Sequence, residues 1–286
     1  MYAITGITGK VGGAMARELL ASGKSVRAIV RNLGKAGEWQ ALGCEIAIAD
    51  MGDEAALTRA FRGAEGVFIL PPSNFDPLPG FPEARAEATI IRDALQAAQP
   101  GKIVCLSTIG GQATQTNLLS QRTILEQTLG TLTIPLTILR PAWFLDNLAW
   151  DVASASEDGI IHSFLQPADR RIPMIATADV GRFAAQCMQD TWTGRRIIEI
   201  EGPARVSPND IADAFSGILS HPVRVEIVPR ETWGAMFRSQ GMRDPMPRIQ
   251  MLDGFNEGWI RFENSESEIL QGTVDMRAVI KDLVGL

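Results

Sequence analysis

The sequence predicts an α/β protein with a doubly wound parallel sheet and a smaller C-terminal α/β lobe. Short apolar runs alternate with helical patterns five times over residues 1–140, the rhythm of strands joined by crossover helices. The first apolar run, residues 2–4, leads directly into the glycine-rich segment 6–12. Beyond residue 150 the alternation breaks, which indicates a second, smaller unit.

Each element of the sheet follows from a local pattern. Apolar residues at helical spacing after Gly12 end at Ser22-Gly23, so a helix joins the first two strands. The runs that predict strands are 2–4, 26–30, 45–49, 66–70, 102–106 and 136–139. The patterns that predict the later helices are 55–61, 83–98 and 118–129. The turn-rich segment 73–82 predicts a loop over the ligand edge of the sheet.

The C-terminal half contains helical and strand patterns in a different order. Ser207 and Pro208 form a typical helix start, with serine as N-cap and proline at the first helical position. The other predicted elements are helices at 179–188 and 232–240 and strands at 196–200 and 223–228. We therefore expect a nucleotide-binding domain over 1–150, rejoined by about 175–202, and a substrate-binding lobe over 151–286.

Composition excludes several classes of function. The 286 residues carry a net charge of −6 and a pI near 5.1, which argues against a nucleic-acid surface. No twenty-residue apolar run predicts a membrane span, and a strand that begins at residue 2 leaves no room for a signal peptide. Three widely spaced cysteines fit buried thiols in a reducing cytoplasm, and the two histidines suggest no metal site.

The glycine-rich segment predicts a dinucleotide site of the Rossmann type. Gly6 allows the tight turn, Gly9 lets the backbone approach the phosphates, and Gly12 allows the helix to pack closely on the strand. The phosphates would lie on the free N–H groups at the positive end of the helix. A glycine-rich turn without a ligand is the alternative interpretation.

The second strand ends in Arg31, with no acidic residue at its tip. An acid at this position accepts from the ribose 2′-hydroxyl of NAD, whereas an arginine suits the 2′-phosphate of NADP. We therefore expect NADP(H) in preference to NAD(H), with a solvated arginine as the alternative. Ligand should lie beyond the carboxyl ends of the strands, at 6–12, 31–32, 50–51, 70–72, 107–109 and 141–147.

With these elements in place, the chain resembles the NmrA-like group of atypical short-chain dehydrogenases/reductases. The motifs that carry the resemblance are TGITGKVG (5–12), VRAIVRN (26–32), FILPP (68–72), LSTIGG (106–111), ILRPAWFLDN (138–147), DVGR (179–182) and EGPARVSPNDIA (201–212). The resemblance implies NADP(H) with its pyrophosphate at Gly6, Thr8, Gly9, Lys10, Val11 and Gly12, its 2′-phosphate at Arg31, its adenine by Asp50 and Met51, its adenine ribose near Leu70 and Pro71, and its nicotinamide near Ser107, Thr108, Ile109, Pro141 and Phe144. It also implies a small lobe beyond residue 145 that closes over the substrate.

One departure from the group concerns the catalytic acid. Typical short-chain dehydrogenases use Tyr-x-x-x-Lys, but the only tyrosine here is Tyr2, and no lysine lies between Lys102 and Lys281. Leu118 and Arg122 stand at the corresponding spacing, so the catalytic residues are unknown. A site without a proton donor favours acceptors that give weakly basic products, such as quinones and azo compounds. Candidates for an apolar pocket that binds an aromatic substrate are Trp143, Phe144, Asn147, Trp150, Phe164 and Trp233, and ordinary core packing is the alternative for the aromatic ones.

Two classes of function remain open at this point. The first is an NADPH-dependent oxidoreductase that transfers hydride to a quinone-like or other conjugated small molecule. The second is a non-catalytic NADP(H)-binding redox sensor that controls a protein partner, as the resemblance allows. Reduction of a carbonyl or double bond with Ser107, Thr108 or a bound water as the donor is a third possibility.

Overall fold

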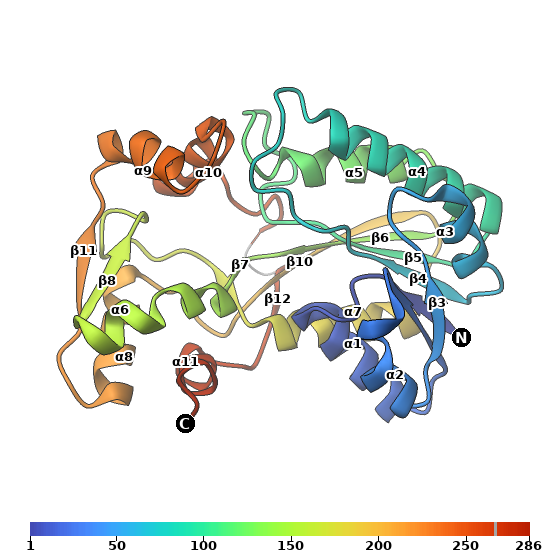
Figure 1. Cartoon of the computed structure of the whole chain (residues 1–286), viewed down its shortest axis with the longest axis horizontal. Helices are drawn as coiled ribbons and strands as arrows, with labels where there is room; N and C mark the ends of the chain where they lie inside the picture. Colours follow the sequence, from blue (N-terminus) through green and yellow to red (C-terminus); the bar gives the residue numbers. More distant parts are fainter. Residues whose placement is uncertain (266–267) are drawn as a thin grey trace.

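The computed structural model describes residues 1–265 and 268–286 and shows the predicted α/β architecture (Figure 1). Its centre is an eight-stranded sheet in the order β12-β10-β6-β5-β4-β1-β2-β3, with parallel pairing throughout. The strands of this sheet are β1 (Tyr2–Ile4), β2 (Val26–Val30), β3 (Glu45–Ile48), β4 (Gly66–Ile69), β5 (Ile103–Leu106), β6 (Leu136–Pro141), β10 (Arg195–Glu201) and β12 (Leu270–Gln271). The doubly wound parallel sheet expected from the sequence is confirmed.

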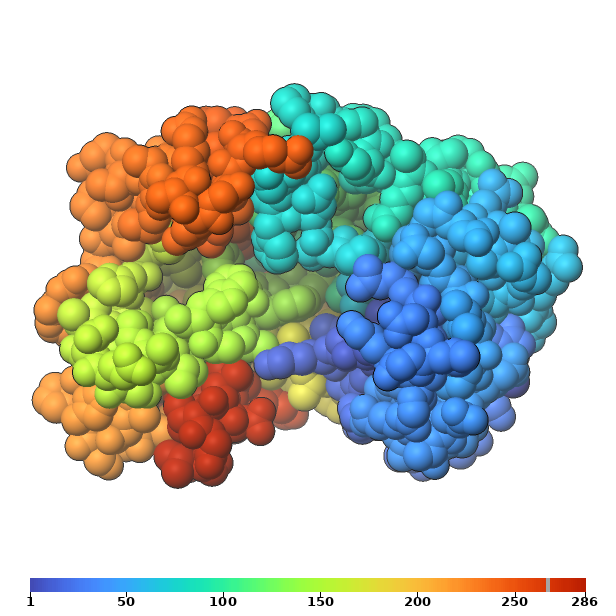
Figure 2. All heavy atoms as spheres, in the orientation of Figure 1, coloured from blue at the N-terminus to red at the C-terminus, as the bar shows by residue number. Residues whose placement is uncertain are grey.

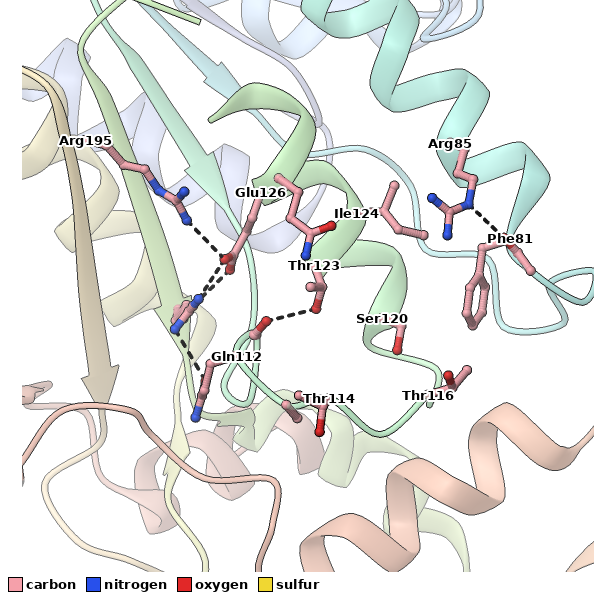
Figure 3. Close-up of a pocket in the computed structure, with 15 residues that line it drawn as sticks. Phe81, Arg85, Gln112, Thr114, Thr116, Ser120, Thr123, Ile124, Glu126 and Arg195 are labelled. Atoms are coloured by element: carbon pink, nitrogen blue, oxygen red, sulfur yellow. Dashed lines mark hydrogen bonds and ion pairs between the residues drawn. The ribbon is translucent and has the colours of Figure 1, made fainter. Parts of the chain in front are cut away.

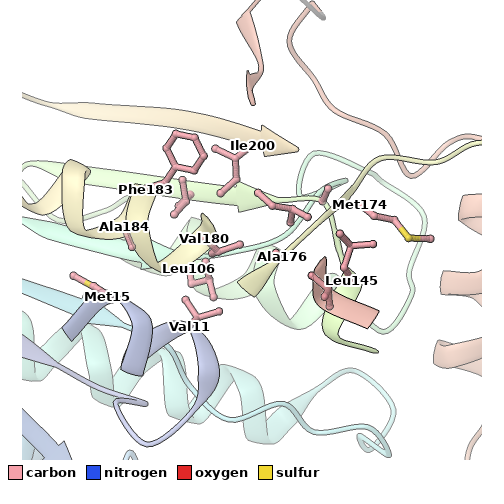
Figure 4. Close-up of a cluster of buried hydrophobic side chains, with 14 of the residues drawn as sticks. Val11, Met15, Leu106, Leu145, Met174, Ala176, Val180, Phe183, Ala184 and Ile200 are labelled. Carbon is pink, nitrogen blue, oxygen red and sulfur yellow. The ribbon is translucent and has the colours of Figure 1, made fainter. Parts of the chain in front are cut away.

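Helices cover both faces of the sheet. The helices α3 (Glu54–Phe61), α4 (Pro82–Ala98) and α5 (Ser120–Leu129) pack on one face. The helices α1 (Lys10–Ala21), α2 (Gly37–Ala41) and α7 (Thr177–Gln189) lie on the other face, and the short 3₁₀ turn η1 (Leu33–Lys35) directly precedes α2. Apolar side chains of α1 and α7, among them Val11, Met15 and Val180, form one buried cluster with Leu106 of β5 (Figure 4).

Small residues bring α1 and α7 close together. A Cβ added at Gly181 of α7 would lie 2.5 Å from Ala14 Cβ and 2.9 Å from Val11 O. Contacts this short do not occur in real structures. Only glycine at position 181 therefore allows α7 to pack this closely on α1, the helix that begins at the glycine-rich turn.

The C-terminal half builds a second group of elements at the carboxyl edge of the sheet (Figure 1). Two parallel pairs, β7–β9 and β8–β11, form here. The elements are β7 (Trp143–Phe144), η2 (Leu145–Trp150), α6 (Val152–Glu157), β8 (Ile160–Ser163), β9 (Met174–Ile175), α8 (Pro208–Leu219), β11 (Arg224–Ile227), η3 (Arg230–Thr232), α9 (Trp233–Ser239), α10 (Met246–Glu257) and α11 (Met276–Val284).

Several boundaries and elements differ from the expectation. The strand expected at 136–139 continues to Pro141, because the main-chain pairing of β6 with β10 extends that far. The helix expected at 232–240 is confirmed as α9, and the 3₁₀ turn η3 directly precedes it. The sequence patterns above predict no element over 246–257, where the helix α10 forms. Pro247 lies in the first turn of α10, where a missing N–H leaves no hydrogen bond unmade. In the described part of the chain, no helix is both long and apolar enough to cross a membrane.

Candidate functional site

The backbone between β1 and α1 forms a cradle of glycine residues. Gly6 adopts a left-handed φ of 64°, which glycine takes without strain. A Cβ at Gly12 would lie 2.3 Å from Gly6 O and 2.7 Å from Gly6 C, so only glycine fits. Gly9 is the N-cap of α1 and is exposed, and among the described residues no side chain caps this end of the helix. The free N–H groups of the first turn are therefore open to an anion, as a dinucleotide pyrophosphate requires.

A threonine side chain fixes the adjoining strand end. Thr5 Oγ1 donates to Phe68 O at 3.0 Å and accepts from Leu70 N at 2.8 Å. A Cβ at Gly6 would lie 3.2 Å from the side chain and carbonyl oxygen of Leu70. Leu70 and the buried Pro71 are thus held directly beside the glycine cradle.

The predicted adenine end of the site is exposed. Arg31 follows β2 and makes no hydrogen bond or ion pair with other described residues, so its guanidinium is free for a ligand. Asp50 follows β3 and its Oδ1 accepts from Gly52 N at 2.9 Å, which shapes the turn before α3. Met51 is half-buried beside it. The residues present fit a nucleotide that carries a 2′-phosphate.

Main-chain bonds continue past the ends of β5 and β6 at the predicted nicotinamide end. Ser107 N donates to Leu139 O and Ile109 N donates to Pro141 O, both at 2.8 Å. Ser107 is 6% exposed, and Thr108 beside it is half-buried. Phe144 is half-buried in β7, three residues after Pro141. The structure therefore gathers these positions at the same sheet edge as the glycine cradle.

The lysine of the glycine-rich segment reaches the C-terminal half. Lys10 Nζ lies 2.8 Å from Asp146 Oδ1 in η2. Asp146 also accepts from Thr177 N and Thr177 Oγ1 at the start of α7. Burial alone would raise the pKa of Asp146, but the hydrogen bonds from Lys10 and Thr177 outweigh it and hold this pKa below its usual value. Figure 2 shows a hollow between the two halves, into which dark-blue N-terminal atoms project.

The structure brings together some of the predicted pocket residues and not others. Phe164 contacts Trp233, with ring centroids 5.7 Å apart, but Trp233 is fully buried and its indole N–H donates to Val228 O. Trp143 packs edge-on against Phe255 at 4.9 Å and joins two apolar clusters. Asn147 is half-buried in η2, whereas Trp150 is 67% exposed. Their role in substrate binding stays a prediction.

The positions of the missing acid–base pair have other uses. Leu118 is buried before α5. Arg122 donates to Pro71 O at 2.9 Å and to Ser73 Oγ at 3.2 Å, and burial lowers its pKa. Tyr2 is buried within β1, where desolvation and the charge of Glu65 raise its pKa. None of these three side chains offers a phenol or an ammonium group at the nicotinamide end.

A buried ionic network behind Ser107 was missed by the sequence reasoning. Glu126 of α5 and Arg140 of β6 are 2% and 3% exposed and form two parallel hydrogen bonds, Nε to Oε1 at 2.9 Å and Nη2 to Oε2 at 2.7 Å. The Ser107 hydroxyl donates to Glu126 Oε1. An arginine inside the apolar run of β6 was the available signal, because a buried cation needs an anionic partner.

This network also lines a surface cavity of about 540 Å³ between α4 and the start of α5 (Figure 3). Figure 3 shows Arg195 directed at Glu126 and the Phe81 ring directed towards Thr116 and Ser120. The cavity and the predicted nicotinamide end thus share one wall, the Glu126–Arg140 pair.

Comparisons with known proteins give a consistent assignment. A family model described as the NmrA-like family matches residues 2–256. The chain is 27% identical over 247 residues to quinone oxidoreductase 2 of Escherichia coli, covering 85% of this chain and 83% of that protein. It is 25% identical over 260 residues to an NAD(P)H azoreductase of Xenophilus azovorans, covering 90% and 85%.

Solved structures show the same fold. The NADPH-dependent quinone oxidoreductase of Escherichia coli, complexed with NADPH, superposes with a TM-score of 0.77 at 23% identity and covers 100% of this chain and 95% of that one. A triphenylmethane reductase of Citrobacter sp. superposes with a TM-score of 0.82 at 18% identity, covering 100% and 99%.

Proposed function

Because the chain belongs to the NmrA-like family, we propose that it is an NADPH-dependent oxidoreductase that transfers hydride to quinone-like or other conjugated small molecules. Its relatives in this family include proteins named as a quinone oxidoreductase and an azoreductase. The observation that carries the proposal is an intact glycine cradle combined with a buried leucine, Leu118, where a catalytic tyrosine is expected.

The cradle and its surroundings support the cofactor. The Gly6–Gly12 turn leaves the first N–H groups of α1 free for a pyrophosphate, and Arg31 has no carboxylate partner in the described residues that would compete with a 2′-phosphate. NADPH bound there supplies the hydride. Ser107 and Pro141 are the residues that we place at the nicotinamide ring, and Asp50 and Met51 are those that we place at the adenine.

The lack of an acid decides which acceptors the site suits. Hydride transfer to a ketone creates an alkoxide, whose conjugate acid has a pKa near the ~15.7 of water. Hydride transfer to a quinone creates a phenolate, whose conjugate acid has a pKa of about 10. The difference of about 6 units is worth on the order of 8 kcal/mol. Quinones and conjugated azo compounds are therefore reduced with solvent completing the protonation, iminium ions become neutral amines on hydride transfer and need no proton, and simple ketones are poor substrates.

The remaining contribution to catalysis is positioning. We assign the acceptor to the hollow between the two halves, within ~3–3.5 Å of the nicotinamide carbon. Residues 1–150, rejoined by about 175–202, bind the nucleotide in this proposal, and residues 151–286 form the substrate lobe. Phe164 of this lobe and Trp143 and Phe144 of the preceding segment are half-buried, and in this proposal they give the hollow a flat apolar surface. We assign the protein to the cytoplasm.

The test is NADPH oxidation, followed by absorbance, with a panel of quinones, an azo dye and a simple ketone. We expect turnover with the conjugated acceptors and little with the ketone. Faster ketone reduction than quinone reduction would contradict the argument from the missing acid. NADPH binding without turnover of any acceptor would instead indicate the redox sensor, and a partner protein would then be sought.

A further inference from the structure

The hydrogen bond between Ser107 and Glu126 has a defined direction. Both carboxylate oxygens of Glu126 accept from Arg140, at 2.9 Å from Nε and 2.7 Å from Nη2. A carboxylate engaged in this way has acceptors only. The Ser107 hydroxyl must therefore be the donor in its contact with Glu126.

This contact determines what Ser107 can still do. Its single hydroxyl proton is directed at Glu126, and no other described group donates to its Oγ. The two lone pairs of the hydroxyl oxygen remain available. Ser107 lies one residue beyond β5, at the carboxyl edge of the sheet, and keeps a small exposed fraction of 6%.

The rest of the network prevents Glu126 from turning away. Arg140 is held from its other side by Glu263 at 2.7 Å, and it lies 3.8 Å from the fully buried Glu199. Burial alone would lower the pKa of Arg140, but the hydrogen bonds and charges of Glu126 and Glu263 outweigh it and raise this pKa. A guanidinium clamped between carboxylates fixes the plane of the Glu126 carboxylate.

We propose that Glu126 is a positioning residue that makes Ser107 a hydrogen-bond acceptor for the N–H of the nicotinamide carboxamide. This inference rests on the cofactor of the proposed function. The carboxamide N–H is the donor that the nicotinamide presents, and an oxygen with its own proton turned away is its complement. Ser107 then orients the ring for hydride transfer and gives no proton to the substrate, which removes it as the donor for ketone reduction.

The first experiment compares two cofactors by fluorescence titration in the wild type and in Ser107→Ala. NADPH carries the carboxamide, whereas the reduced 3-acetylpyridine analogue has a methyl group in place of the NH₂. We expect Ser107→Ala to weaken NADPH binding about tenfold, the effect of one lost hydrogen bond, and to leave binding of the analogue within about twofold. An equal loss for both cofactors overturns the assignment of the N–H, and unchanged NADPH binding overturns the contact itself.

The second experiment separates positioning from a structural effect. We expect Glu126→Gln to weaken NADPH binding about tenfold in the wild type and to have no further effect in Ser107→Ala, because Glu126 acts through that hydroxyl. Glu263→Gln removes a charge beside Arg140 but keeps an amide oxygen that accepts from its guanidinium, and it does not touch Ser107, so it should leave NADPH affinity unchanged. A full Glu126→Gln effect in the Ser107→Ala background overturns the proposal.

The two experiments also distinguish this inference from the proposed function. Both measure cofactor affinity, so they are decided even if no acceptor is turned over. If Glu126→Gln does not fold, which its buried ion pair makes a risk, the comparison of NADPH with the acetylpyridine analogue in Ser107→Ala still decides whether Ser107 accepts from the carboxamide.

Discussion

Alanine at two glycine positions of the cradle should affect different properties: stability at Gly12 and NADPH affinity at Gly9. At Gly12 a Cβ would lie 2.3 Å from Gly6 O and 2.9 Å from Ile7 Cα, and backbone atoms cannot move aside cheaply. We expect Gly12→Ala to lose about 2 kcal/mol of unfolding free energy, a typical overpacking cost. At about 2.1 cal/mol/K per residue, this loss lowers the Tm of a chain of this length by about 3–4 °C.

Gly9 has a different environment. Its nearest atom is Gly6 O, 3.3 Å from an added Cβ, and the residue is exposed. Gly9→Ala should therefore keep its Tm within about 1 °C of the wild type and still lose NADPH affinity more than tenfold, because the methyl group occupies the approach to the phosphates. Gly37, where a Cβ meets nothing within 4 Å, is the matched control. Wild-type NADPH affinity in Gly9→Ala would refute the phosphate cradle, and a Tm drop as large as that of Gly12→Ala would refute the steric reasoning.

Three further substitutions test the charges around the site. Arg31→Ala should weaken NADPH binding at least tenfold, through loss of a charge-assisted hydrogen bond, and leave NADH binding nearly unchanged. Arg59→Ala, at another exposed arginine, is the control, and equal losses for both nucleotides would exclude a 2′-phosphate contact. Burial raises the pKa of Asp151 to about 6, so the ionised carboxylate destabilises the fold as the pH rises through this value. Asp151→Asn should therefore raise Tm at pH ~8 and not at pH ~4. An unchanged Tm at pH ~8 would show that the buried charge does not destabilise the fold. The pKa of Asp146 is lower in the folded protein than in the unfolded chain. The ionised carboxylate therefore stabilises the fold above the unfolded-state pKa, and this stabilisation is lost as the pH falls through the folded-state pKa. Asp146→Asn should therefore cost about 1–2 kcal/mol at pH ~7 and progressively less below pH ~4 in urea unfolding, and a constant difference would rule out the ion pair as its cause.

The sheet could be predicted because its signals are local. Each strand from β1 to β6 is an apolar run bounded by turn residues, and helix starts such as Ser207-Pro208 carry their own capping chemistry. The prediction was weakest where tertiary packing decides the structure. The helix α10 contains Pro247 and Gly254, and α6 has only six residues, so neither has a strong pattern of its own.

The candidate site also has one part that local sequence patterns predict and one part that depends on tertiary packing. The cradle is a backbone feature, and glycine spacing reports backbone conformation directly, so Gly6 and Gly12 could be placed from the sequence. The Glu126–Arg140 pair and its partner Glu263 join residues 14 and 123 positions apart, and no spacing rule relates such residues. Their contact depends on how α5 and the segment after α10 pack around β6, which only the tertiary structure shows.

The glycine cradle and the engaged side chains affect different parts of the reaction: the first binds the cofactor, and the second limit the choice of acceptor. The cradle presents fixed N–H donors and needs no side-chain chemistry, so it accommodates a dinucleotide whatever the acceptor is. Two groups that could have stabilised an alkoxide are already engaged: the Ser107 hydroxyl donates to Glu126, and the Arg122 guanidinium donates to Pro71 O. An acceptor that holds its new negative charge in its own conjugated system needs neither of these groups. Selectivity for quinones over ketones then follows because neither of these engaged groups is a free donor that would stabilise an alkoxide-like transition state.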